Sequence, residues 1–136
     1  MRVSYAVRNM MTKDIVSVEG TTAINEALNL MVEKNIGSVV VTRDGEIVGI
    51  MTERDIVRKC CPVNQCTVMK AEEIMSSPLV TIDAGAAIGE AADLMAQRKI
   101  RRLLVTEEGK IRGIITERDV LRATLDVFKT LSEAFV

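Results

Sequence analysis

The four residues Thr-Glu-Arg-Asp occur twice in this sequence, at positions 52–55 and 116–119, and a glycine precedes each set by three positions. An ionised aspartate offers two acceptor oxygens, which match the two hydroxyl donors of a ribose cis-diol. Arginine binds phosphate oxygens through two bonds. A helix N-terminus adds unpaired N–H groups and the positive end of a dipole. The set therefore favours a nucleotide, with its sugar on Asp and its phosphate on Thr, Arg and the helix end.

The same spacing also predicts a capping box, in which two side chains bond each other's backbone amides at the start of a helix. This interpretation explains the Thr and Asp residues at about 1 kcal/mol per cap. It leaves four residues unexplained: Arg54, Arg118, Gly49 and Gly113. We expect the glycines, which lack a Cβ, to let a ligand lie close to the backbone. The two interpretations compete, because an aspartate bonded to its own cap is not free for a ribose, and we favour the ligand.

These motifs belong to a longer duplication. Residues 11–58 align with residues 75–122 without a gap, and 20 of the 48 aligned positions are identical. Two copies are too few for a solenoid, so we expect two similar lobes related by a pseudo-twofold axis. We predict the first repeat with its lead-in at 1–61, a linker at 62–70 and the second repeat with an extended C-terminal helix at 71–136.

Each repeat follows the order strand, helix, strand, strand, helix. A short β-branched strand runs into a turn near residues 14–20 and 78–85, and helical spacing of apolar residues follows at 21–35 and 86–98. Thr21 or Thr22 could cap the first of these helices. Asp44-Gly45 predicts a hairpin turn, and residues 68–75 predict a short helix. The fold class is therefore α/β (α+β).

At these motifs the sequence strongly resembles a tandem pair of CBS domains, the regulatory repeat named after cystathionine β-synthase, over about residues 7–125. The resemblance implies two β-α-β-β-α repeats packed through their sheets, with two related clefts that bind AMP, ADP, ATP or S-adenosylmethionine. It implies ribose on Asp55 and Asp119, the α-phosphate or the sugar on Thr52 and Thr116, and phosphates on Arg54 and Arg118. The remaining cleft residues it implies are Ser17, Thr81, Ile15, Val16, Leu79, Val80, Ile36, Gly37, Ser38, Ile100, Arg101 and Arg102. The two arginines would give the second cleft a preference for more phosphate, or they are solvated strand-end residues.

Composition limits the other functions. The net charge is −1 with no basic run, and aromatic residues make up 2%, so nucleic-acid binding is not expected. No signal-peptide core or membrane-length apolar stretch is visible, which predicts a soluble, cytoplasmic protein that does not enter a membrane. Cys60, Cys61 and Cys66 stand without any histidine, so we expect no metal site and favour inert thiols over a disulfide, with a Cys61–Cys66 bridge as the alternative.

We therefore expect a non-enzymatic, stand-alone sensor of adenosyl ligands that requires no cofactor and acts on an unknown partner, in trans or as a homodimer. A weak nucleotide hydrolase is one alternative, with Glu53 and Glu117 as its metal-binding candidates. A protein- or nucleic-acid-interaction adaptor is the other. The C-terminal helix carries an apolar stripe that favours a dimer contact: Leu121, Leu125, Phe128, Leu131 and Phe135.

Overall fold

The structure is a computed structural model that describes residues 6–77 and 79–135. It divides into two compact units, Ile15–Leu79 and Met1–Asp14 with Val80–Val136. We call them the repeat-1 unit and the repeat-2 unit. Each unit holds a three-stranded sheet and its own aliphatic core.

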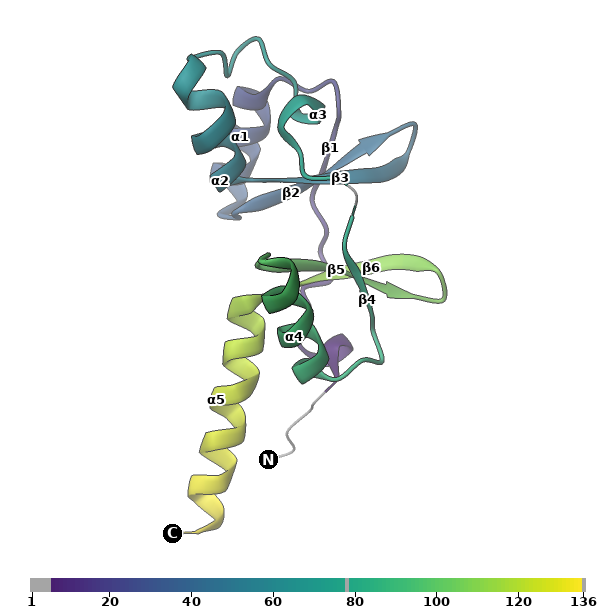
Figure 1. The fold of residues 1–136 in the computed structure, drawn as a ribbon, viewed down its shortest axis with the longest axis vertical. Coiled ribbons are helices and arrows are strands. Elements are labelled where there is room, and N and C mark those ends of the chain that lie inside the picture. Colours follow the sequence, from purple (N-terminus) through teal and green to yellow (C-terminus); the bar gives the residue numbers. More distant parts are fainter. Residues whose placement is uncertain (1–5, 78, 136) are drawn as a thin grey trace. The chain divides into compact units, whose positions relative to one another are not determined.

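The repeat-1 unit has the predicted element order (Figure 1). Its elements are β1 (Ser17–Glu19), α1 (Ile24–Lys34), β2 (Ser38–Arg43), β3 (Glu46–Thr52), α2 (Glu53–Asp55), the π-helical turn η2 (Ile56–Cys60), the 3-10 turn η3 (Cys61–Val63) and α3 (Ala71–Ile74). β1 pairs parallel with β2, which α1 makes feasible as the crossover, and β3 pairs antiparallel with β2.

The repeat-2 unit repeats this topology. Its elements are the 3-10 turn η1 (Val7–Asn9), β4 (Thr81–Asp83), α4 (Ile88–Arg98), β5 (Arg102–Glu107), β6 (Lys110–Thr116) and α5 (Glu117–Ala134). Where the first repeat breaks into π and 3-10 turns after its motif, the second continues as one regular helix of 18 residues.

Both hairpins turn through two residues with positive φ, as a two-residue hairpin of the I′ type requires. Asp44 and Gly45 have φ values of 52° and 81°, which confirms the Asp-Gly turn. Glu108 and Gly109 have φ values of 53° and 77°.

The boundaries of the compact units differ from the boundaries of the two sequence repeats. The lead-in of the first repeat pairs with the last strand of the second, since Thr12 N donates to Ile114 O at 2.8 Å. The equivalent residue Ser76 pairs with Ile50 of β3, with Ser76 N donating to Ile50 O at 2.8 Å. Residues up to Asp14 therefore group with the second repeat, and residues 62–79 group with the first.

The start of α1 is capped differently from the sequence expectation. Its N-cap residue is Ala23, and no side chain bonds the first amides. Instead Ile24 N donates to Met69 O at 3.0 Å and Asn25 N donates to Cys66 O at 2.9 Å. The expectation that Thr21 or Thr22 caps this helix is wrong, because a distant backbone segment supplies the acceptors.

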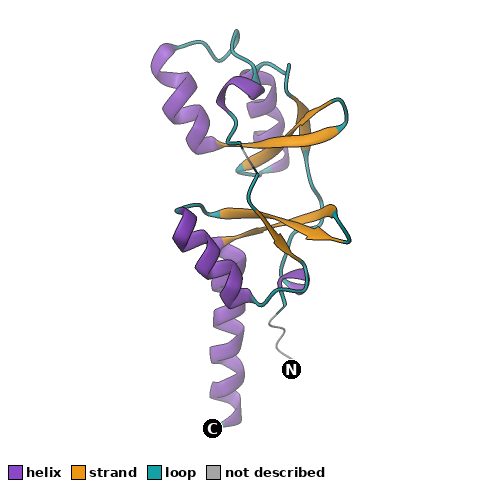
Figure 2. Cartoon of the chain, turned by 45° about the vertical axis from the view of Figure 1, so that its right-hand side comes forward, coloured by secondary structure: helices purple, strands orange, loops and turns teal. Residues whose placement is uncertain are grey.

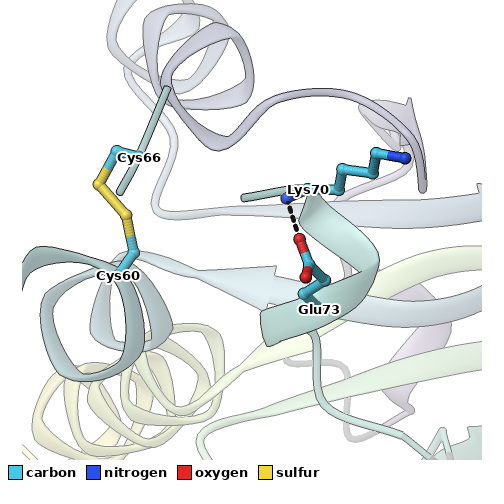
Figure 3. Close-up of a disulfide and its surroundings, with 4 residues drawn as sticks. All are labelled: Cys60, Cys66, Lys70 and Glu73. Atoms are coloured by element: carbon cyan, nitrogen blue, oxygen red, sulfur yellow. Dashed lines mark hydrogen bonds between the residues drawn. A yellow bond between two sulfur atoms is a disulfide. The ribbon is translucent and has the colours of Figure 1, made fainter. Parts of the chain in front are cut away.

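The expectation of inert thiols and the alternative pairing of Cys61 with Cys66 are both wrong. A disulfide joins Cys60 to Cys66 (Figure 3), with their Cα atoms 5.6 Å apart. Cys60 is fully buried at the end of η2, whereas Cys61 is exposed and free. Neighbouring residues on a helical turn point in different directions, so only Cys60 faces the segment that carries Cys66.

Candidate functional site

In the repeat-1 unit, the predicted site residues meet at one end of the sheet. The register places Ser38 of β2 opposite Thr52 of β3, and β1 begins at Ser17 on the same side. Two backbone bonds join the flanking segments to this end: Val40 N donates to Val16 O at 3.0 Å, and Glu53 N donates to Gly37 O at 3.0 Å. Segments distant in the sequence therefore form one edge beside the start of α2.

The repeat-2 unit has an equivalent edge. Arg102 of β5 lies opposite Thr116 of β6, and β4 begins at Thr81. Leu104 N donates to Val80 O at 3.1 Å, and Glu117 N donates to Arg101 O at 2.9 Å. The structure thus brings together the same positions in both repeats. Leu79 is the last residue of the repeat-1 unit and lies at the boundary between the two.

The apolar residues expected to frame a base also serve the cores. Val16 and Ile36 pack against the repeat-1 core, and Val80 and Ile100 pack against the repeat-2 core. All four are half-buried, as is Ile15. They therefore present only part of their surface at the edge.

Both Thr-Glu-Arg-Asp motifs form complete capping boxes. Asp55 Oδ2 accepts from Thr52 N at 2.9 Å and from the Thr52 hydroxyl at 3.1 Å, and Asp55 N donates back to that hydroxyl at 3.2 Å. Asp119 and Thr116 repeat this geometry at 2.9, 3.1 and 3.3 Å. The hypothesis that each aspartate stands clear of its own cap is wrong: Thr and Asp satisfy each other locally, as the competing interpretation predicted.

The second oxygen of each carboxylate faces a basic side chain. Asp55 Oδ1 lies 3.5 Å from Lys59 Nζ, and Asp119 Oδ1 lies 3.7 Å from Arg122 Nη1. The aspartate side chains are only 12% and 9% exposed, whereas their basic partners are about half exposed or more. The sequence analysis missed Lys59 and Arg122; their positions four and three residues after an aspartate on a helix would have indicated them.

The other charged residues of the motifs point to solvent. Arg54 and Arg118 are exposed in the first helical turn, as are Glu53 and Glu117. Arg101 Nε lies 3.8 Å from Glu117 Oε1, with both side chains 64% exposed. Exposed pairs of this kind contribute little stability. Arg102 is half-buried at the start of β5.

Gly49 and Gly113 have a structural role that corrects the expectation of room for a ligand. A Cβ on Gly113 would lie 2.7 Å from Thr12 O and from Met11 Sδ. A Cβ on Gly49 would collide with Met75 Sδ and lie 3.0 Å from Ser76 O. The space beside each glycine is filled by the lead-in segment that pairs with its strand.

The described part of the chain contains no group of three or more Cys, Asp or Glu side chains placed to hold a metal ion. None of its helices has the length and apolar character needed to cross a membrane.

Comparison with known proteins accounts for the duplicated edge. The model of the CBS domain matches the chain twice, over residues 7–61 and 71–126. The chain belongs to the CBS-domain family. The fold class is confirmed, because the two three-stranded sheets with their helices match solved CBS-domain structures.

Several relatives match most of this CBS pair. The CBS domain-containing protein YhcV of Bacillus subtilis is 30% identical over 115 residues, covering 85% of this chain and 82% of that protein. A protein of Pyrococcus horikoshii has a TM-score of 0.82 at 36% identity, with 91% and 95% of the two chains covered. A CBS-domain protein of Agrobacterium tumefaciens has a TM-score of 0.82 at 28% identity, covering 90% and 95%. The family is one of regulatory and signal-transduction modules.

Proposed function

We propose that this CBS pair is a non-enzymatic sensor that binds an adenosyl ligand such as AMP, ADP, ATP or S-adenosylmethionine, and regulates a partner protein. The observation that carries the proposal is the duplicated sheet edge, at which Ser17 or Thr81, the start of the next strand and a Thr-Glu-Arg-Asp turn come together. Membership of the CBS family supports the adenosyl class of ligand.

The capping boxes change the atoms that a ligand would use. Oδ2 of Asp119 already accepts two hydrogen bonds, so a ribose hydroxyl would donate to Oδ1, in place of or beside Arg122. The Thr116 hydroxyl gives its proton to Asp119, and an ordinary phosphate oxygen needs a donor. We therefore assign the phosphate to Arg118, through its guanidinium and its backbone amide. In this turn the amide of Glu117 already donates to Arg101 O, and the amide of Asp119 donates to the Thr116 hydroxyl. The amide of Arg118 between them is therefore the one that could donate to a ligand. Asp55, Thr52 and Arg54 would act in the same way in the first repeat.

The exposed Glu53 and Glu117 support a binding role better than hydrolysis. Each stands alone as a carboxylate at the surface of its turn, whereas metal-assisted phosphate chemistry needs several oxygen ligands around one cation. The other carboxylate of each motif already uses its Oδ2 oxygen in the cap. We propose that regulation arises from the different affinity of the ligand for two conformations of the pair.

Isothermal titration of the whole chain with AMP, ATP and S-adenosylmethionine tests the proposal. Asp119→Asn and Asp55→Asn are the informative variants, because Asn keeps an acceptor for the cap but replaces the second oxygen by a donor. We expect each to weaken binding at its own site at least tenfold, with little change in unfolding temperature. Asp93→Asn, an exposed site on α4, is the matched control. The absence of saturable binding for all three ligands would overturn the proposal.

A further inference from the structure

The Cys60–Cys66 disulfide ties together two segments of the repeat-1 unit. The offset of 64 residues that relates the repeats places Thr124 and Thr130 at the positions of these cysteines, and both threonines lie within the regular helix α5. In the repeat-1 unit the turn η2 ends at Cys60 instead, and the chain comes back to the start of α1. The repeat-1 unit therefore holds a bond that a thiol can open, at a place where the second repeat has none.

The segment that carries Cys66 caps α1. It runs over residues 61–70, and Figure 2 shows most of it as a loop that leads from η2 to α3. All but two of its residues are exposed; Cys66 and Met69 are half-buried and pack against the repeat-1 core. The carbonyl oxygens of these same two residues accept from Asn25 N and Ile24 N, and α1 has no side-chain cap of its own. The first amides of α1 are therefore bonded by a segment that buries little surface, and segments of this kind open readily.

The other end of the bond belongs to the turn that follows the first Thr-Glu-Arg-Asp motif. Cys60 is fully buried in the repeat-1 core. The residue before it, Lys59, donates from Nζ to Ile74 O at 3.1 Å and lies 3.5 Å from Asp55 Oδ1. The disulfide thus joins the cap of α1 to the turn that supplies the basic partner of Asp55. Neither segment can move away from the other while the bond is closed.

We propose that the Cys60–Cys66 bond is a reversible redox switch that sets the order of η2 and of the start of α1. With the bond closed, the carbonyls of Cys66 and Met69 stay on the first amides of α1. With the bond open, this stretch opens locally more often, because its loop is no longer closed at Cys60. Its far end stays in place, since Ala71 N donates to Thr22 O at 2.8 Å. The inference does not rest on the proposed ligand binding, because it concerns the order of the backbone.

The two sulfur atoms differ in access, which fixes the course of the exchange with a dithiol. Cys66 is half-buried, whereas Cys60 is covered completely. One thiolate of the dithiol attacks Cys66 Sγ, the bond to Cys60 Sγ breaks, and the Cys60 thiolate takes up a proton. The second thiolate of the dithiol then attacks the dithiol's own sulfur in the mixed disulfide, and Cys66 leaves and is protonated. The dithiol gives up two electrons and two protons and departs as a disulfide, and a small disulfide reverses the sequence.

Hydrogen exchange of the full chain, read by mass spectrometry of peptides, tests the switch before and after addition of dithiothreitol. We expect reduction to add two hydrogen atoms to the intact protein and to speed exchange by about tenfold or more in residues 21–28 and 56–60. Residues 85–92 and 120–124 occupy the equivalent positions of the second repeat and are the internal control, with no change expected. Oxidised glutathione is then expected to restore both the bond and the slow exchange. Unchanged exchange in either repeat-1 peptide, or a bond that dithiothreitol leaves intact in the folded protein, would overturn the inference.

Two cysteine variants separate the bond from general effects of a reductant. Cys66→Ser cannot form the bond and is expected to exchange like the reduced wild type, whether or not dithiothreitol is present. Cys61→Ser removes the neighbouring exposed thiol, keeps the bond, and is expected to respond like the wild type. Circular dichroism is expected to show folded protein for both variants. Faster exchange that also reaches residues 85–92 and 120–124 would mean unfolding of the whole chain and would refute a local switch.

Discussion

Oδ2 of Asp119 accepts hydrogen bonds from both the backbone N–H and the hydroxyl of Thr116, at 2.9 and 3.1 Å. Counted as a whole residue, Asp119 is 6% exposed, and it is the one buried charged residue in the described part of the chain. Its burial is tolerable because both cap bonds and the nearby Arg122 compensate the lost hydration. The motif therefore stabilises the start of α5 whatever ligand it also binds.

Removal of the cap hydroxyl is expected to destabilise the repeat-2 unit. Thr116→Ala takes away the acceptor for Asp119 N and leaves Oδ2 with one partner fewer, which costs about 1 kcal/mol of unfolding free energy. Thr116→Ser keeps the hydroxyl and is expected to stay within a few tenths of a kcal/mol of the wild type. Chemical denaturation of both variants provides the measurement. Equal stability of the two variants would show that the cap contributes nothing.

The lead-in pairing predicts that Gly113 does not tolerate a methyl group. Gly113→Ala places a Cβ 2.7 Å from the backbone oxygen of Thr12, and backbone yields less readily than a side chain. We expect a loss of about 1–3 kcal/mol in unfolding free energy. Gly89→Ala is the control, because its Cβ would meet nothing within 4 Å and alanine favours the helix by up to about 1 kcal/mol. A neutral Gly113→Ala would mean that the lead-in does not pair as described.

The disulfide is expected to stabilise the repeat-1 unit. It closes a short loop between Cys60 and Cys66, for which chain entropy predicts about 2 kcal/mol. Cys66→Ser is expected to lose this amount, and a reductant is expected to lower the wild type to the same level. Cys61→Ser leaves the bond intact and serves as the control. The contribution is disproved if reductant leaves the denaturation midpoint of the wild type unchanged.

The second hairpin offers a stabilising change. Glu108 has a φ of 53°, a conformation that asparagine tolerates better than glutamate and that suits an Asn-Gly turn. We expect Glu108→Asn to raise the unfolding free energy by roughly 0.5 kcal/mol. Thermal denaturation would detect the rise, and Glu46→Asn, in an extended strand, is the control and is not expected to gain stability. A lower midpoint for Glu108→Asn would contradict the proposed turn preference.

Local patterns in the sequence predicted what depends on near neighbours. The apolar spacing of residues 24–34 and 88–98 predicted α1 and α4, and Asp44-Gly45 predicted its hairpin. The Thr-x-x-Asp spacing indicated the capping boxes, although we favoured the ligand over them. The duplication indicated two equivalent sheet edges, which the strand register confirmed.

The sequence alone therefore determined two repeats and their element order, because backbone periodicity and helix capping act over a few residues. Only the tertiary structure decided which lead-in pairs with which repeat, what fills the space beside Gly49 and Gly113, and which cysteine joins Cys66. These outcomes depend on contacts between residues far apart in the chain. Such contacts are selected by the packing of a whole core, and no short pattern of residue types encodes them.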